Sequence, residues 1–256
     1  MAILALDTSA AIAVAVLDDA GRTLAARGHD TARHHAELLA PTIADALSAA
    51  GLDAGDVRRV VVGTGPGPFT GLRAGLVTAR SFAHATGATL LGVSSLDALA
   101  AQGVDALALQ PGSDVVVATD ARRREVYWAR YTVVSRGAES EDGAVARVDL
   151  VAGPDVGAAD ALVASGALDG AVVTGRGVHL YPVLATAGQA ALGAAGADAD
   201  AGVAVTRRAG VDLPDPAVLA RLGIARQALG EDLPTEPLYL RRPDVQAAAG
   251  RKRVLG

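Results

Sequence analysis

Short apolar runs separated by turn residues open the chain. The first run, residues 2–6, is continuous and ends at Asp7. Two more runs follow at 11–18 and 22–28, with Gly21 in the turn between them. Short runs with turn chemistry between them are typical of strands that pair through hairpins. The pattern therefore predicts a three-stranded antiparallel meander at the start of the fold.

Helical spacing then alternates with buried strands. Apolar residues repeat at helical spacing over 33–51, and Pro41 lies inside this segment. A proline in a helix interior removes a backbone hydrogen bond, so we expect this helix to be kinked or split. The other elements expected in this half are a strand at 57–63, a helix from about Thr70 to Gly87 that Thr70 can cap, and a strand followed by a helix start within 89–100.

The second half of the chain repeats this pattern. Residues 115–120 form an apolar run that ends in Asp120, as residues 2–6 end at Asp7. The run at 171–177 ends in Gly-x-Gly, like the run that ends at Gly63. Both pairs of features are separated by about 112 residues, and a fixed internal period indicates repeated architecture. The sequence therefore predicts an α/β fold built from two βββαβα units.

Two such units resemble the actin/Hsp70/sugar-kinase (ASKHA) architecture, in which two related domains face a cleft. We expect an N-terminal domain over 1–105, a C-terminal domain over 106–240 and a flexible basic tail over 241–256. In this architecture, turns that carry aspartates approach the phosphates of a nucleotide. The residues that this analogy places near such a vestigial or shared nucleotide site are Asp7, Thr8, Ser9, Gly65, Gly67 and Asp120. A likeness of fold alone does not specify function.

The loop GTGPGPF at 63–69 has the look of a phosphate site but lacks the known fingerprints. A P-loop requires a lysine after its second glycine, and the Rossmann fingerprint requires a glycine where Pro68 stands. Uncovered backbone ahead of a helix can still hold an anion. The alternative is a rigid turn, with Gly71 and Gly75 giving close packing on the helix that follows. The residues themselves leave these two alternatives open.

Composition excludes several classes of chemistry. The chain contains no cysteine, so it has no disulfide, no thiolate nucleophile and no cysteine-ligated zinc. No His-Glu-x-x-His motif occurs among its five histidines. A net charge of −5 argues against a general nucleic-acid coat. The basic run 122–124 is then either a solvated hairpin tip or a contact for phosphate or RNA. With no signal peptide and no long apolar run, we expect a soluble cytoplasmic protein without a membrane span.

Several segments together resemble the TsaB (YeaZ) family. They are ILALDTS at 3–9, HHAELLAPTI at 34–43, GTGPGPFTGLRAG at 63–75, DARRREVYWA at 120–129 and PTEPLYLRRPDV at 234–245. This family is the dimerisation subunit of the bacterial complex that makes threonylcarbamoyladenosine (t6A) in tRNA. One departure is Pro68, which stands where the family usually has serine.

The resemblance implies that this chain is a subunit that does not itself catalyse a reaction. The catalytic subunit of the complex, TsaD, holds its metal with two histidines four positions apart, and Ser95 and Leu99 stand at the matching positions here. Leucine cannot ligate a metal and a neutral serine is a poor ligand, so no metal and no catalytic residue are expected. No cofactor is expected in the isolated chain, although ATP or ADP is expected at the joint with partners. An active ATP-dependent kinase or ATPase of the same fold is the alternative, and a metallopeptidase is a weaker one.

The resemblance also implies the partners. They are TsaD, the ATPase TsaE, tRNA indirectly through the complex, and a second copy of the chain when TsaD is absent. The interface would use the helices at about 33–50 and 70–86. Its expected residues are Ala36, Leu39, Ala40, Ile43, Gly71, Ala74, Gly75, Thr78 and Ala79, which offer small side chains for close helix packing. We expect Gly75→Arg to block the complex while the isolated chain stays folded.

Overall fold

Two β-sheets form the framework of the protein. The structure is a computed structural model that describes residues 1–29, 34–137, 144–187 and 211–241. Its five-stranded sheet has the order β3-β2-β1-β4-β5, and its four-stranded sheet has the order β8-β7-β6-β9. Strand β1 pairs antiparallel with β2 and parallel with β4, and β6 pairs in the same way with β7 and β9.

The elements of the first sheet follow the order that the hydrophobic pattern predicts. They are β1 (Ala2–Asp7), β2 (Ile12–Asp18), β3 (Thr23–His29), α1 (His35–Ala49), the short 3-10 helix η1 (Ala54–Asp56), β4 (Val57–Gly63), α2 (Phe69–Thr86) and β5 (Thr89–Val93). Helix α3 (Ser95–Ala106) then leads toward the second sheet, with Ser94 as its N-cap. The Ser94 hydroxyl accepts a hydrogen bond from the amide of Leu96, as expected for a serine cap.

The second half repeats the first. Its elements are β6 (Asp114–Asp120), β7 (Glu125–Ser135), β8 (Arg147–Ala158), α4 (Ala159–Ala164), β9 (Ala171–Thr174) and α5 (Gly177–Leu180), and α8 (Pro216–Ala228) comes later in the chain. The order βββαβα therefore occurs twice, and β8-β7-β6-β9 matches β3-β2-β1-β4 strand for strand. This confirms the predicted duplication and the two-unit, ASKHA-like α/β fold.

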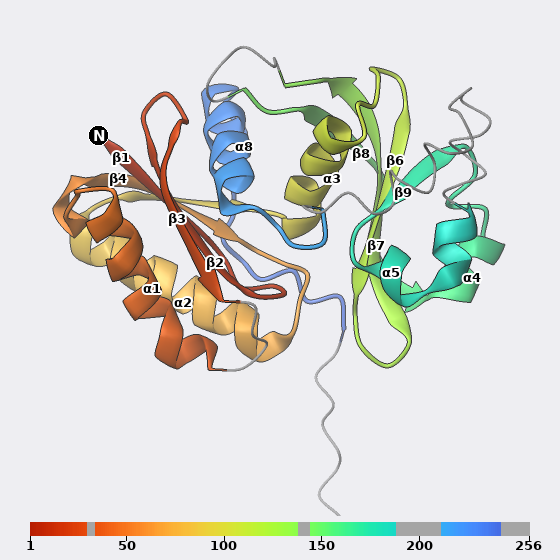
Figure 1. Ribbon diagram of the computed structural model, residues 1–256, viewed down its shortest axis with the longest axis horizontal. Helices are drawn as coiled ribbons and strands as arrows, with labels where there is room; N and C mark the ends of the chain where they lie inside the picture. The colour runs from red at the N-terminus through yellow and green to blue at the C-terminus, as the bar shows by residue number, and fades with distance from the viewer. Residues whose placement is uncertain (30–33, 138–143, 188–210, 242–256) are drawn as a thin grey trace, which may run out of the picture.

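Helices and sheets alternate in layers (Figure 1). Helices α1 and α2 cover the outer face of the first sheet, and α4 and α5 pack on the second sheet. Helices α3 and α8 lie between the two sheets. Strand β1 is consequently buried on both faces, with Ile3 and Ala5 pointing to the middle layer and Leu4 and Leu6 to the outer helices. A strand buried on both sides reads as a continuous apolar run, which is the pattern seen at 2–6.

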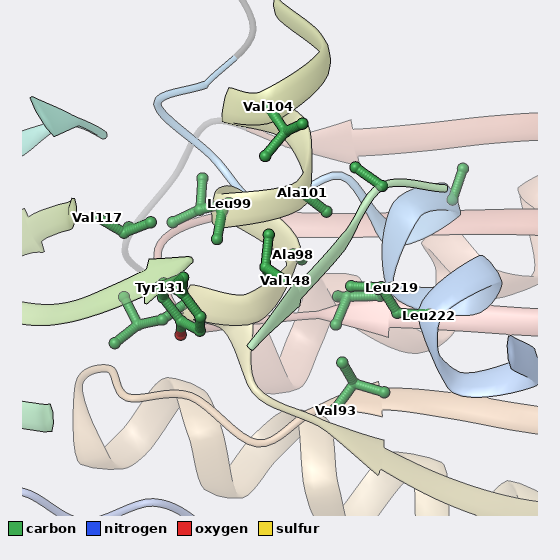
Figure 2. Close-up of a cluster of buried hydrophobic side chains, with 14 of the residues drawn as sticks. Val93, Ala98, Leu99, Ala101, Val104, Val117, Tyr131, Val148, Leu219 and Leu222 are labelled. Carbon is green, nitrogen blue, oxygen red and sulfur yellow. The ribbon is translucent and has the colours of Figure 1, made fainter. Parts of the chain in front are cut away.

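The middle layer holds a shared hydrophobic core that joins the two sheets. Figure 2 shows side chains of this core converging from both sheets, α3 and α8, among them Val93, Val117, Tyr131 and Leu219. Leu99 of α3 belongs to the same core and is 1% exposed. This core joins two lobes: the first sheet with α1 and α2, and the second sheet with α4 and α5.

The structure decides one local alternative and corrects one local prediction. Helix α1 continues through Pro41 as a single helix, so it is not split. Helix α2 begins at Phe69 after Pro68, which makes no side-chain cap. The expectation that Thr70 caps this helix is wrong, because the chain already turns at the proline.

The chain does not divide simply at the predicted boundaries. Helix α8, which follows the second unit in sequence, packs against β1, β2 and β4 of the first sheet. The boundaries at 105 and 240 remain a prediction, and residues 242–256 of the expected tail lie outside the described residues. None of the helices described is both long and apolar enough to cross a bilayer.

Candidate functional site

A cleft lies between the two lobes below α3. Its walls come from both halves of the chain, with Ser9, Pro68 and Ser95 on one side and Asp120 and Arg122 on the other. The duplication explains this arrangement, because Asp7 ends β1 and Asp120 ends β6 at equivalent places. The structure thus brings Ser9 and Asp120 to one cleft. It leaves Asp7 and Thr8 buried beneath the cleft wall, each 1% exposed.

The Asp7 carboxylate is enclosed by hydrogen bonds from the protein itself. One oxygen, Oδ1, accepts from the Ser9 amide at 2.8 Å and from the Ser9 hydroxyl at 2.6 Å. The other oxygen, Oδ2, accepts from the Ser95 hydroxyl at 2.5 Å. Because Ser95 is 2% exposed, this bond is made inside the molecule. Both oxygens are therefore occupied by donors of this chain.

Ser95 and Leu99 are the two positions that the sequence resemblance matched to metal-binding histidines. Ser95 donates to Asp7, and Leu99 is in the shared core. Both side chains thus have structural partners. Within the described ranges, no group of three or more His, Cys, Asp or Glu side chains could hold a metal ion.

The glycines of the loop 63–69 are required by packing. A Cβ on Gly63 would lie 1.9 Å from Asp7 Oδ2, and one on Gly67 would lie 2.6 Å from the Ser9 carbonyl oxygen. Gly65 has a φ of +92°, and its carbonyl accepts from the Ser95 amide at 2.8 Å. The loop therefore folds back onto the β1–β2 turn and the start of α3.

The same packing corrects one expectation about Gly75. Thr8 donates a hydrogen bond to the Gly71 carbonyl at 2.8 Å, and a Cβ on Gly75 would lie 2.2 Å from Thr8 Oγ1. Gly75 is buried and faces the inside of the lobe. The expectation that Gly75→Arg leaves the chain folded is wrong, because the new side chain would have no space.

Helices α1 and α2 pack side by side on the first sheet. Several residues of the expected partner interface are buried inside the lobe and cannot contact a partner. The residues packed inside the lobe are Leu39, Ile43, Gly71, Gly75 and Ala79. Ala36 and Ala40 of α1 are exposed, and Ala74 and Thr78 of α2 are partly exposed. The same outer side of α2 carries Val77, which is 60% exposed and did not enter the sequence prediction. An exposed valine with Ala74 and Thr78 nearby on the same helix is a typical contact for another helix.

A turn of three arginines forms the tip of the β6–β7 hairpin. Arg122, Arg123 and Arg124 have φ values of 65°, 54° and 64°, all in the left-handed region. The Asp120 carboxylate accepts from the Arg122 amide at 2.7 Å and lies 3.3 Å from its guanidinium. Left-handed residues match the twist of a tight hairpin but are normally glycine or asparagine. Three arginines here store strain, and such strain concentrates at functional sites.

The Gly-x-Gly of the second unit also serves packing. A Cβ on Gly175 would lie 2.5 Å from the Ala118 carbonyl oxygen, and one on Gly177 would lie 2.8 Å from the same atom. Both glycines are thus needed for β9 and α5 to approach β6. Arg176 between them lines the cleft.

A segment to which the sequence analysis assigned no element runs along strand β5 and helix α2. Residues 231–241, here called the strap, leave α8 and lie along β5 and α2. The Leu233 carbonyl accepts from the Gly92 amide at 3.0 Å, and the Leu238 amide donates to the Thr64 carbonyl at 2.9 Å. Arg80 of α2 donates to the Thr235 carbonyl at 2.8 Å. The only sequence signal for the strap was the motif PTEPLYLRR, which has no helical or strand period.

The strap ends on the second lobe. Arg241 donates to the Ala121 carbonyl at 3.0 Å and forms an ion pair with Glu125. Before that point, the Tyr239 ring packs against Phe69 with centroids 5.0 Å apart, and the Tyr239 hydroxyl accepts from Arg73 at 3.0 Å. The strap therefore connects the outer side of α2 with the arginine hairpin.

A buried polar network holds the lobes together on the opposite side. The Tyr131 hydroxyl donates to Asp97 Oδ1 at 2.7 Å, and Arg226 of α8 donates to Asp97 Oδ2 at 2.6 Å. Burial, reinforced by the Asp97 charge, raises the pKa of Tyr131 well above its ordinary value. This network joins α3, β7 and α8, and its three residues line a different pocket from the cleft described above. It is a structural contact.

The chain matches one described protein family over most of its length. Residues 28–198 fit the family described as "TsaD: tRNA N6-adenosine threonylcarbamoyltransferase". The solved structure described as "YeaZ from Pseudomonas aeruginosa" is 25% identical, with a TM-score of 0.64, and the match covers 93% of this chain and 100% of that one.

Curated relatives match shorter stretches. An uncharacterized protein of Mycobacterium tuberculosis H37Rv is 53% identical over 100 residues, which cover 39% of this chain and 44% of that protein. The tRNA threonylcarbamoyladenosine biosynthesis protein TsaB of Escherichia coli K12 is 37% identical over 132 residues, which cover 51% of this chain and 55% of that protein. The matched region thus spans about half the length of these relatives, or less.

Proposed function

Because the chain belongs to the family of the tRNA N6-adenosine threonylcarbamoyltransferases, on its TsaB (YeaZ) branch, we propose that it is a non-catalytic subunit in t6A biosynthesis. In this role it pairs with a catalytic subunit of the TsaD type and works with an ATPase of the TsaE type. The product of the complex is the threonylcarbamoyl group on N6 of adenosine 37, in tRNAs that read codons starting with A.

The Asp7–Ser95 hydrogen bond is the observation that carries the proposal. A catalytic subunit needs ligands that bind a metal beside the nucleotide, and histidine is the usual choice for such sites. Here the matching positions hold a serine that donates to a buried aspartate and a leucine in the core. A buried carboxylate whose two oxygens already accept hydrogen bonds has little left to offer a cation.

The alternative, an active kinase or ATPase, has less support. Such an enzyme requires open phosphate loops and a carboxylate that reaches magnesium. Here Gly63 and Gly67 of the loop pack against Asp7 and Ser9, and Gly175 and Gly177 pack against Ala118. We propose instead that any ATP or ADP is held at the joint between this chain and its partners.

The outer side of α1 and α2 is the surface that we assign to the partner. It offers the small side chains of Ala36, Ala40, Ala74 and Thr78, and the exposed Val77 of α2. Small side chains let helices approach closely, and a central apolar residue is a typical anchor of such contacts. A second copy of the chain is proposed to occupy this surface when the catalytic subunit is absent.

Reconstitution of tRNA modification tests the proposed function. Purified catalytic subunit, ATPase and tRNA, supplied with ATP and threonylcarbamoyl-adenylate as the group donor, should form t6A only when this chain is added. The chain alone, with ATP and magnesium, should release no phosphate above the level of a buffer blank. Phosphate release by the isolated chain would support the kinase or ATPase alternative, and t6A formed equally well without the chain would contradict the proposal.

A further inference from the structure

A pocket next to the cleft combines aromatic rings with arginines. The chain has only one tryptophan, four tyrosines and two phenylalanines. Three of these rings, Phe69, Tyr127 and Tyr239, line this pocket together with Arg122 and Arg241. They come from α2, β7 and the strap, so the fold collects them from distant parts of the sequence. Three aromatic rings around one pocket, in a chain with few aromatic residues, suit a ligand with a flat face.

The pocket also contains groups that can form hydrogen bonds with the polar edge of a flat ligand. Tyr127 is 7% exposed and lines this pocket. The Asp120 carboxylate lines the same pocket and, after burial, is the second cause that raises the pKa of Tyr127. A neutral hydroxyl and a carboxylate acceptor side by side suit the amino and ring nitrogens of a nucleobase.

The two outer rings are partly exposed, and the Arg73 guanidinium covers one face of Phe69. Phe69 is 37% exposed and Tyr239 is 40% exposed, and their centroids lie 5.0 Å apart. The Arg73 guanidinium lies 3.6 Å from the centroid of the Phe69 ring and holds it in place. Aromatic side chains that are exposed but fixed are platforms on which unpaired bases stack.

The arginine turn supplies positive charge at the rim of the pocket. Arg122 is 62% exposed in its side chain and is held only loosely by Asp120, at 3.3 Å. Arg123 and Arg124 follow it in the same left-handed conformation. In a chain with a net charge of −5, this cluster opposes the overall sign. Glycine would adopt this backbone conformation with less strain, so the arginines contribute positive charge at a backbone cost.

We propose that this pocket and the arginine turn bind one unstacked nucleotide of a single-stranded RNA loop. The base stacks against Phe69 and Tyr239 with its polar edge toward Tyr127 and Asp120, and the neighbouring phosphates contact the arginine turn. The shared chemistry, a base with a phosphate, also occurs in free nucleotides. The choice of RNA rests on the proposed function in tRNA modification.

Fluorescence anisotropy with a labelled stem-loop RNA and the full chain tests this inference. The chain should bind the stem-loop more tightly than a fully paired duplex, and binding should weaken with salt. The combined variant Arg122→Gly, Arg123→Gly and Arg124→Gly keeps the left-handed turn without its charges. It should keep its Tm within a few degrees and lose about tenfold or more in affinity. Tyr239→Ala should lose about tenfold.

A matched control and two competitors separate the other outcomes. Arg147→Ala, on exposed β8 away from the pocket, should leave binding unchanged. Equal binding by the triple glycine variant, or no binding by the natural chain, would overturn the inference. Full displacement of the RNA by ADP at equal concentration would assign the pocket to free nucleotide, and displacement by an acidic peptide would assign it to a protein.

Complex formation with the catalytic subunit is measured in the same samples. RNA binding without a complex would count against the proposed function alone. A complex that forms normally, with a chain that does not bind RNA, would count against this inference alone.

Discussion

The Ser95 hydroxyl donates a 2.5 Å hydrogen bond to the carboxylate of Asp7 inside the first lobe. This pair links the end of β1 to the start of α3, so it fixes the wall of the cleft. It also accounts for Gly63, since any side chain at that position would meet the same carboxylate. Ser95 therefore has a structural role in the packing of the first lobe.

Ser95→Ala should destabilise the chain without abolishing partner binding. It removes one hydrogen bond to a buried charged group, which typically costs about 1.5–3 kcal/mol. Urea unfolding measures this loss. Ser48→Ala, on the exposed side of α1, is the control and should stay within about 0.5 kcal/mol of the natural chain. A neutral result for Ser95→Ala would mean that the Asp7 pair does not stabilise the lobe.

Gly75→Ala should destabilise the first lobe through overpacking. The added Cβ would lie 2.2 Å from Thr8 Oγ1, and Thr8 is held by its bond to Gly71. Overpacking of this kind typically costs about 1–3 kcal/mol, and arginine at this site should prevent folding. The Tm measured by circular dichroism is the readout. A folded Gly75→Arg chain would show that α2 can move away from the β1–β2 turn.

Tyr131→Phe tests the buried network that joins the lobes. Because the folded pKa of Tyr131 lies above its ordinary value of 10.0, the hydroxyl stabilises the fold fully below that pH. This contribution is lost as the pH rises toward the folded pKa, since the unfolded chain ionises first. The variant should lose about 1–3 kcal/mol at neutral pH and show a weaker loss of stability above pH 10.0. Urea unfolding at both pH values measures it, and parallel alkaline curves would contradict the assignment.

Arg241→Gln should loosen the strap where it meets the second lobe. Its contacts with Ala121 and Glu125 are partly exposed, so the stability loss should be only about 1 kcal/mol. Hydrogen exchange of the hairpin amides at 121–125 should nevertheless become faster. Arg221→Gln, which removes a similar contact to Gly21 within the first lobe, should leave that hairpin unchanged. Equal exchange in both variants would mean that the strap does not hold the hairpin.

The fold was largely predictable because its signals are local. Apolar runs buried on both faces, turn glycines and an internal repeat predict both sheets, and the repeat pairs Asp7 with Asp120 correctly. Burial of the helix faces was harder to predict. Gly75 and Val77 are two positions apart on α2, and only the packing of Thr8 shows which one faces inward.

The strap and the aromatic pocket could not be read from periodicity. Residues 231–241 form no helix or strand, and their contacts with Thr64, Gly92 and Arg80 depend on the tertiary arrangement. Phe69, Tyr127 and Tyr239 are far apart in sequence and meet only because the strap returns to the hairpin. The motifs that carry the family resemblance include these three segments, and the structure brings them together around one pocket.

Binding between this chain and a TsaD-type catalytic subunit, measured with Val77→Arg and Val151→Arg, tests the central claim most directly. The two valines are 60% and 57% exposed, and they lie on α2 and on β8. Both variants should fold with a stability change of about 0.5 kcal/mol or less. Val77→Arg should weaken the complex by about tenfold or more while Val151→Arg leaves it intact. An unchanged complex with Val77→Arg, or a loss confined to Val151→Arg, would contradict the assignment of the partner to α1 and α2.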